Sequence, residues 1–208
     1  MGKPWIKVCG ITGADDIDLL VDCGATAVGL NLWPSSPRSV SHEELLRLTD
    51  LARGRLDVVW VTVDLELGSL KSLVEQGRPD WVQLHGDQGL DFFEALNTKA
   101  FYAVGLKEPS HVADALAAPG NLVLIDARDE ALKGGTGVLA PLDLALQVTE
   151  ARTTLLAGGL TPDNVGDRIA SCRPGGVDTA SGVESAPGVK DPDKVRRFCE
   201  SARLAFGV

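Results

Sequence analysis

Short apolar runs, rich in β-branched residues, alternate with amphipathic stretches along the whole chain. An apolar run of four to eight residues between turn residues is typical of a strand that is buried on both faces. We expect such strands over residues 5–9, 27–32, 57–63, 80–84, 100–104, 121–126, 153–157 and 177–180. Helical patterns separate them, which predicts a parallel sheet with helices on its faces.

Eight strand–helix units favour a closed (β/α)8 barrel, the TIM barrel, and no shift in composition or linker divides the chain. We therefore expect residues 1–208 to form a single domain. The alternative is an open Rossmann or flavodoxin-like sheet. No strand is followed by the G-x-G-x-x-G pattern of dinucleotide-binding sheets, and an open sheet of five or six strands would leave two units unplaced.

Capping patterns mark where several of the helices should begin. Ser41-x-x-Glu44 is a capping box, and Thr12-x-x-Asp15 resembles one. Thr161 and Asp191 each precede a proline, the order expected of an N-cap followed by the first helical residue.

The net charge and the cysteine spacing exclude several kinds of partner and site. The net charge of −9 argues against nucleic acid or an anionic membrane as the main partner, and no apolar run is long enough to span a bilayer. The four cysteines lack C-x-x-C spacing and the three histidines are scattered, so we expect neither a metal site nor a disulfide framework. No cofactor motif is present. The composition predicts a cytoplasmic protein.

Unusual residues fall where the predicted strands end. In a (β/α)8 barrel the chemistry lies at the carboxyl ends of the strands and in the loops that follow them. The residues at these positions are Cys9, Arg38, Gln83, His85, Asp126, Gly135, Gly137, Gly158, Gly159, Asp178, Ser181 and Gly182. We therefore expect all of them on one rim of the barrel.

Cys9 and Asp126 are the candidate proton-transfer groups. Cys9 lies on the same strand face as Lys7 and precedes Gly10, in a position that favours the thiolate. Asp126 follows a buried apolar run, which would raise its pKa and suit a general acid. The alternatives are a small buried residue at position 9 and a loop-capping carboxylate at position 126. An acid and a base on either side of a phosphorylated sugar are what an aldose–ketose isomerisation requires.

Glycine-rich loops follow the last two strands, where these barrels commonly bind phosphate. Gly158 and Gly159 follow the seventh strand, and Ser181 and Gly182 follow the eighth. Glycine lets backbone N–H groups approach an anion, although it also serves simple tight turns. Gly135 and Gly137 are expected in a loop over the same ligand.

Several longer motifs, taken together, are specific enough to indicate one protein family. They are KVCGIT (7–12), GATAVGLNLWPSSPRSVS (24–41), VQLHGD (82–87), LIDA (124–127), GGTG (134–137), LAGGLTPDNV (156–165) and VDTASGVESAPGVKD (177–191). In these motifs, and over nearly its whole length, the chain resembles the phosphoribosylanthranilate isomerase family, (β/α)8 enzymes of tryptophan biosynthesis.

The resemblance implies an Amadori rearrangement of N-(5-phosphoribosyl)anthranilate to 1-(2-carboxyphenylamino)-1-deoxyribulose 5-phosphate. Asp126 would be the general acid and Cys9 the general base, and Arg38 would hold the anthranilate carboxylate. Lys7, Gln83, His85 and Asp178 are further expected substrate-binding residues, although His85 has the alternative role of orienting a loop. We expect a phosphoribosyl substrate, no nucleic-acid or membrane partner, and a monomer or homodimer.

The chain departs from the family pattern at four places that would surround the aromatic ring of the substrate. These are 30–32 (LNL), 61–64 (VTVD), 142–144 (LDL) and 180–182 (ASG), where the family has Gly-Phe-x-Phe, Val-Phe-Val-Asn, Phe-Asp-Trp and Ser-Ser-Gly. The alternative functions are a related phosphosugar isomerase with a shifted substrate, such as the histidine-pathway ribonucleotide, or a non-catalytic phosphosugar-binding protein. Enzymes of the first kind generally use two aspartates, so Cys9 argues against it.

Overall fold

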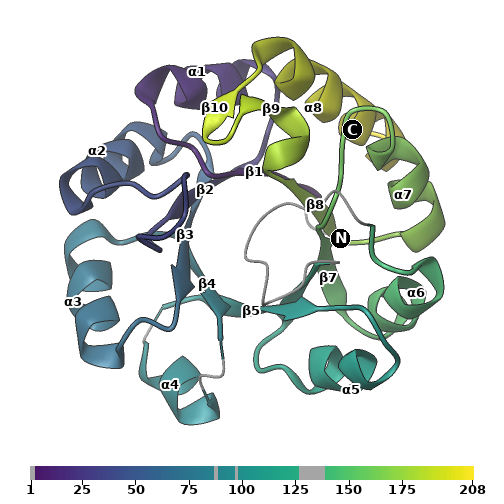
Figure 1. The fold of residues 1–208 in the computed structure, drawn as a ribbon, viewed down its shortest axis with the longest axis horizontal. Helices are drawn as coiled ribbons and strands as arrows, with labels where there is room; N and C mark the ends of the chain where they lie inside the picture. Colours follow the sequence, from purple (N-terminus) through teal and green to yellow (C-terminus); the bar gives the residue numbers. More distant parts are fainter. Residues whose placement is uncertain (1–2, 87–88, 97, 127–138) are drawn as a thin grey trace.

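The computed structural model describes residues 3–86, 89–96, 98–126 and 139–208. Eight parallel strands close into a barrel in the order β1 to β8, with β8 paired to β1 (Figure 1). The strands are Trp5–Cys9 (β1), Ala27–Asn31 (β2), Asp57–Val63 (β3), Trp81–His85 (β4), Ala100–Gly105 (β5), Leu122–Asp126 (β6), Thr153–Leu156 (β7) and Gly176–Thr179 (β8). The prediction of a (β/α)8 barrel is confirmed, and each predicted strand matches within one residue at either end.

Helices surround the barrel and cover the outer face of the sheet (Figure 1). They are Ala14–Asp22 (α1), His42–Ala52 (α2), Leu67–Gly77 (α3), Leu90–Ala95 (α4), Ser110–Ala117 (α5), Leu142–Ala151 (α6), Val165–Cys172 (α7) and Pro192–Phe206 (α8). Because strand side chains alternate in direction, residues such as Ile6 and Val8 point outward into the core shared with these helices.

The barrel interior has an apolar half and a polar half. Toward the amino ends of the strands, Trp5, Trp81 and Phe101 meet edge to face, with ring centroids 5.3 to 6.2 Å apart. Farther along the same strands, Lys7 and Gln83 occupy the next inward positions and are also buried. The aromatic rings therefore fill the amino end of the barrel, and the buried polar side chains lie nearer its carboxyl end.

Two of the expected helix starts are confirmed and two are wrong. The Ser41 side chain accepts from the Glu44 N–H, and Asp191 accepts from the first turn of α8. Helix α1 begins at Ala14, however, and the Thr12 hydroxyl instead donates to the Gly188 carbonyl at 3.1 Å. Helix α7 begins at Val165 rather than near Thr161.

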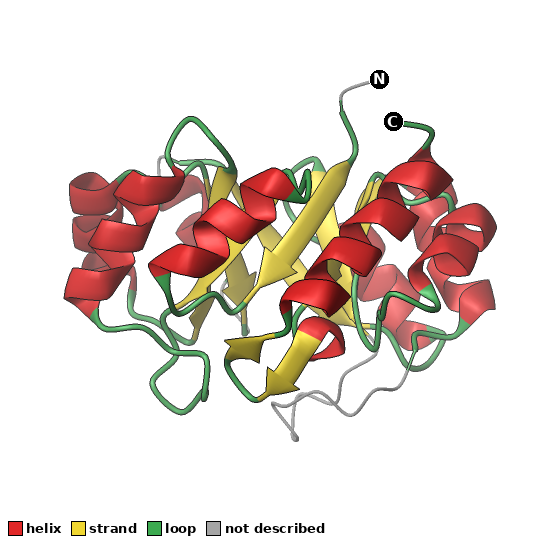
Figure 2. Cartoon of the chain, turned by 90° about the horizontal axis from the view of Figure 1, so that it is seen from above, coloured by secondary structure: helices red, strands yellow, loops and turns green. Residues whose placement is uncertain are grey.

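A short antiparallel hairpin follows the eighth strand and was not predicted. It consists of Glu184–Ala186 (β9) and Val189–Lys190 (β10), and a 3-10 turn over Ser181–Val183 leads into it. Figure 2 shows this hairpin at one end of the barrel and the two chain termini at the other. The hairpin therefore lies on the rim to which the carboxyl ends of the strands point.

Candidate active site

Lys7, Cys9 and Asp178 meet on two neighbouring strands of the barrel. The Lys7 ammonium is fully buried and donates to Asp178 Oδ1 at 2.9 Å, and it also interacts electrostatically with Cys9. Burial by itself would lower the pKa of Lys7, but the charges of Asp178 and Cys9 outweigh it and the pKa is raised. A permanent cation therefore lies beside the Cys9 sulfur.

The Cys9 side chain lies in a small gap between strands. Gly29 is its register partner on β2, and Val61 and Ala180 pack against it. A methyl group at position 29 would lie 2.6 Å from Cys9 Sγ, so the absence of a side chain there makes room for the sulfur. Cys9 is 9% exposed, at the boundary between the buried interior and the rim.

Asp126 is the last residue of β6, and only 8% of it is exposed. Its backbone carbonyl accepts from the Leu106 N–H at 2.7 Å, which fixes the strand end. Strands β7 and β8 separate it from β1, so the carboxyl group approaches the barrel mouth from a different side than the Cys9 sulfur. An acid and a base placed in this way can act on two positions of one bound molecule.

Arg38 lies in the loop after β2 and is engaged by a residue that the sequence did not indicate. Its Nε and Nη2 donate to the two carboxylate oxygens of Glu184, both at 2.7 Å. The side chain of Glu184 is 4% exposed and that of Arg38 is 11% exposed, so this ion pair is largely shielded from water. The two residues are 146 positions apart, which is why spacing did not reveal the pair.

Lys190, on β10, is the second residue that sequence reasoning missed. Its ammonium donates to Glu184 Oε1 at 2.7 Å, to the Cys9 carbonyl at 2.8 Å and to the Ala180 carbonyl at 3.2 Å. Burial would raise the pKa of the Glu184 carboxyl, but the hydrogen bonds and charges of Arg38 and Lys190 outweigh it and the pKa is lowered. The carboxylate is therefore ionised between two cations.

Gln83 and His85 project from the same face of β4, and their side-chain Nε2 atoms lie 2.7 Å apart. Gln83 is buried, and within the described part of the chain its Oε1 atom has no hydrogen-bond partner. A buried amide oxygen in the middle of β4 suits a polar group of a ligand, since leaving it unpaired costs stability.

The two expected phosphate loops, after β7 and β8, contact each other directly. Gly158 and Gly159 both have positive φ, at 83° and 61°, a conformation that favours glycine. Asn164 fixes this loop by donating to the Gly159 carbonyl at 3.0 Å, and the Thr179 hydroxyl donates to the Leu160 carbonyl at 2.8 Å. A methyl group at Gly182 would overlap the Leu160 carbonyl oxygen, so the loops after β7 and β8 touch through backbone.

Ser181 opens the 3-10 turn that follows β8, next to this contact. Two backbone loops held this close can direct N–H groups toward one anion. Gly135 and Gly137 lie outside the described residues.

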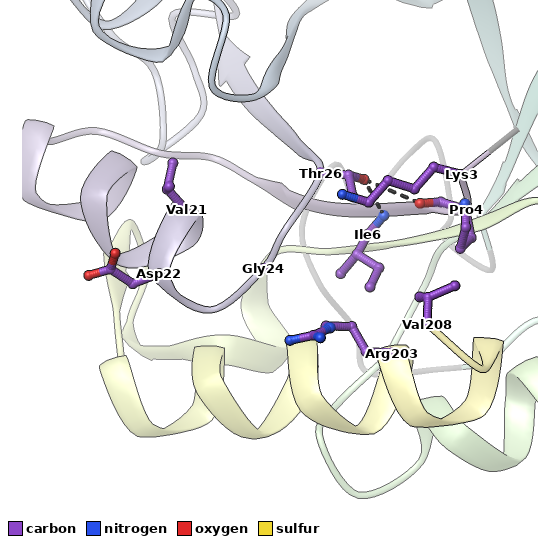
Figure 3. A pocket seen from close by; sticks show the side chains of 9 residues that line it. All are labelled: Lys3, Pro4, Ile6, Val21, Asp22, Gly24, Thr26, Arg203 and Val208. Atoms are coloured by element: carbon purple, nitrogen blue, oxygen red, sulfur yellow. Dashed lines mark hydrogen bonds between the residues drawn. The ribbon is translucent and has the colours of Figure 1, made fainter.

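A hollow of about 370 Å³ lies at the opposite end of the barrel, near both termini (Figure 3). It is lined by Lys3, Pro4, Ile6, Val21, Asp22, Gly24, Thr26, Arg203 and Val208. These residues lie at the amino ends of β1 and β2 and in the helices beside them. None of the candidate site residues lines this hollow.

The described part of the chain lacks two kinds of feature, a metal-binding cluster and a membrane-spanning helix. There, no three histidine, cysteine, aspartate or glutamate side chains gather closely enough to hold a metal ion. No described helix combines the length and apolar character needed to cross a bilayer.

A closed eight-stranded barrel with a thiol, a carboxylate and two glycine loops on its carboxyl-end rim has the layout of a (β/α)8-barrel enzyme. The model of the N-(5'-phosphoribosyl)anthranilate (PRA) isomerase family matches residues 6–201. The N-(5'-phosphoribosyl)anthranilate isomerase of Chelativorans sp. (strain BNC1) is 39% identical, with 97% of each chain covered. That of Geotalea uraniireducens (strain Rf4) is 36% identical, over 95% of this chain and 98% of the relative.

Solved structures agree with these matches. Phosphoribosyl anthranilate isomerase from Thermotoga maritima superposes with a TM-score of 0.88 at 31% identity, over 97% of this chain and 100% of the other. A phosphoribosyl anthranilate isomerase in complex with reduced 1-(o-carboxyphenylamino)-1-deoxyribulose 5-phosphate superposes with a TM-score of 0.85 at 29% identity, with 97% and 100% covered. The chain belongs to the N-(5'-phosphoribosyl)anthranilate isomerase family, and its reaction is the isomerisation of that substrate in tryptophan biosynthesis.

Proposed function

We propose that Cys9 is the general base and Asp126 the general acid of the isomerisation. The observation that supports this most is the buried Lys7 ammonium, which is hydrogen-bonded to Asp178 and interacts electrostatically with Cys9. A cation held beside a sulfur stabilises the thiolate, the form of cysteine that accepts a proton. Asp178 keeps Lys7 in place through a hydrogen bond to a charged group.

Asp126 begins the reaction by opening the ribose ring. It donates a proton to the ring oxygen while the bond between that oxygen and C1′ breaks. The nitrogen lone pair of the substrate forms the C1′=N bond, which gives a protonated Schiff base and leaves Asp126 ionised. The buried setting of Asp126 at the end of β6 suits a carboxyl group that must carry a proton at the start of the cycle.

Cys9 then removes the proton from C2′. The C–H electrons form the C1′=C2′ bond and the C=N electrons return to nitrogen, which gives an enolamine and a neutral thiol. The enol at C2′ tautomerises to the ketone by losing its hydroxyl proton as C1′ gains one. No electrons leave the substrate, so the reaction needs neither an oxidant nor a reductant.

Three further contacts would hold the substrate between these groups. Arg38 would bind the anthranilate carboxylate, because a planar guanidinium matches a carboxylate with two hydrogen bonds. The loops with Gly158, Gly159, Ser181 and Gly182 would bind the phosphate, and Gly135 and Gly137 are further proposed phosphate-binding residues. Gln83 and His85 would contact the ribose from β4, where Oε1 of Gln83 can accept a hydrogen bond from a hydroxyl group.

The loss of substrate fluorescence on isomerisation tests the assignment of the acid and base. Asp126→Asn and Cys9→Ser each keep the shape of the side chain, and each should lower kcat by about two to four orders of magnitude, the usual contribution of a general acid or base. Wild-type rates in either folded variant would refute its assignment.

The role of Lys7 is tested separately with the charge-balanced variant Lys7→Met/Asp178→Asn, which leaves no buried ion unpaired. We expect Cys9 to react more slowly with an alkylating agent at neutral pH in this variant, because a thiolate beside no cation is less stable. An unchanged alkylation rate would show that Lys7 does not assist Cys9.

We also propose that residues 1–208 act as one domain and that the protein is cytoplasmic, as a monomer or a homodimer. The absence of paired cysteine spacing supports a reducing compartment. Fractionation of cells and light scattering of the purified protein test these two points.

A further inference from the structure

The guanidinium group of Arg38 offers two edges, and Glu184 occupies only one. An arginine side chain has five N–H donors in a plane. Nε and one N–H of Nη2 point to Glu184, each at 2.7 Å. The end of the group, formed by Nη1 and the other N–H of Nη2, has no partner among the described residues. That end has the spacing to bind a second carboxylate with two hydrogen bonds.

Glu184 is itself fixed by the hairpin that carries it. Lys190 hydrogen-bonds Glu184 Oε1 from the other strand of the hairpin, and Lys194 donates to the Glu184 carbonyl at 2.8 Å. The side chain of Lys190 is fully buried and that of Glu184 is 4% exposed. Lys190 holds the Glu184 carboxylate and Lys194 holds its backbone, so the position of Glu184 does not depend on Arg38 alone.

The same hairpin touches the loops that carry Cys9 and Arg38. Its tip, Gly188, accepts from the Thr12 hydroxyl at 3.1 Å, and a methyl group on Gly188 would lie 2.8 Å from the Pro37 carbonyl. Lys190 donates to the Cys9 carbonyl at 2.8 Å. The loops after β1 and β2 therefore both rest on the hairpin, 150 or more positions away along the chain.

From these contacts we propose that Glu184 is a positioning residue for the substrate carboxylate. It holds the Nε–Nη2 edge of Arg38, so that the Nη1 end faces the barrel mouth, and Lys190 links this arrangement to the Cys9 strand end. The cluster of Arg38, Glu184 and Lys190 carries one net positive charge, which suits an anionic partner. The inference rests on the proposed function, in which Arg38 binds the anthranilate carboxylate.

The test compares two substrates that differ only in the carboxylate: N-(5-phosphoribosyl)anthranilate and N-(5-phosphoribosyl)aniline. Glu184→Gln should raise KM for the anthranilate substrate about ten- to a hundredfold, because an arginine displaced by about 1 Å no longer meets the carboxylate. KM for the aniline substrate should change much less. Arg38→Met should show the same selectivity, and the double variant should be no worse than Arg38→Met, since Glu184 acts only through Arg38.

Glu44→Gln is the matched control. Glu44 holds Arg47 through the same two nitrogen atoms, at 2.7 and 2.5 Å, but on the exposed face of α2. This variant should leave both substrates unaffected. If Glu184→Gln does not fold, as judged by circular dichroism and the urea midpoint, Glu184→Gln/Lys190→Met removes one charge of each sign and the ratio between the two substrates is measured in its place.

Two results would overturn the proposal in different ways. If Arg38→Met is selective for the carboxylate but Glu184→Gln weakens both substrates equally or neither, Glu184 has only a structural role and the proposed function stands. If Arg38→Met itself shows no selectivity, the carboxylate site of the proposed function is wrong, and the positioning role of Glu184 is wrong with it.

Discussion

Gly29 leaves space for the Cys9 sulfur, so Gly29→Ala tests whether the exact placement of that sulfur matters. An alanine methyl group would lie 2.6 Å from Cys9 Sγ, 2.9 Å from Cα and 3.0 Å from Cβ. Non-bonded carbon and sulfur atoms need about 3.5 to 4 Å, so the thiol must retreat by about 1 Å. Gly29 has no positive φ, which means that the clash rather than backbone strain causes the effect.

A displacement of about 1 Å at a reacting group lowers the rate about a hundredfold, or about 2.7 kcal/mol in activation free energy. We therefore expect kcat of Gly29→Ala to fall by about two orders of magnitude. The phosphate loops are untouched, so product affinity should remain near that of the wild type. Overpacking should also cost about 1–3 kcal/mol in the free energy of unfolding, and urea titration measures this separately.

Gly166→Ala is the control for this experiment. Gly166 lies in α7 and a methyl group there meets no atom within 4 Å, so alanine should stabilise the fold by about 0.4–1 kcal/mol and leave kcat unchanged. Substrate decay followed by fluorescence gives kcat and KM for both variants. A folded Gly29→Ala protein with wild-type kcat would refute the argument that the position of the sulfur limits the reaction.

Three further predictions concern stability. Burial raises the pKa of Cys199 from 9.0 to about 12. The unfolded chain therefore loses this proton first as the pH rises, and stability falls above pH 9. Between pH 8 and 10.5, urea titrations should show wild type losing about 2 kcal/mol more than Cys199→Ala. Trp60→Phe replaces a fully buried indole with a smaller ring and removes its 2.9 Å hydrogen bond to the Thr49 hydroxyl, and should cost about 2–3 kcal/mol by the same titration. Asp191→Ala removes the N-cap of α8 and should lower the free energy of unfolding by about 1 kcal/mol, seen in the thermal midpoint.

The barrel could be predicted because each of its strands is buried on both faces. A strand of this kind, such as 57–63, is a nearly continuous run of apolar residues. Placing Cys9, Asp126 and Asp178 on one rim followed from the fold alone, since parallel strands end together. The inward pairing of Lys7 with Cys9 followed from strand alternation, which has a period of two.

The hairpin after β8 escaped prediction because its strands are only three and two residues long, too short for a periodic pattern. Glu184 and Lys190 were also missed, since nothing local distinguishes them from exposed charges. They are buried because they contact Arg38 and the Cys9 carbonyl, which lie far away along the sequence. The helix start predicted at Thr12 was wrong for the same reason, because its hydroxyl donates to the Gly188 carbonyl instead of capping a helix.

In the proposed mechanism, Asp126 opens the ring and Cys9 then removes the C2′ proton. One isotope measurement separates these two steps. The substrate is prepared with deuterium at C2′, and kcat is compared with that of the ordinary substrate for wild type, Cys9→Ser and Asp126→Asn. Weakening the base should make proton removal rate-limiting, so Cys9→Ser should show a full primary isotope effect. Weakening the acid should make ring opening limiting, so Asp126→Asn should show little or none. The opposite pattern, or equal isotope effects in both variants, would contradict the assignment of the two residues.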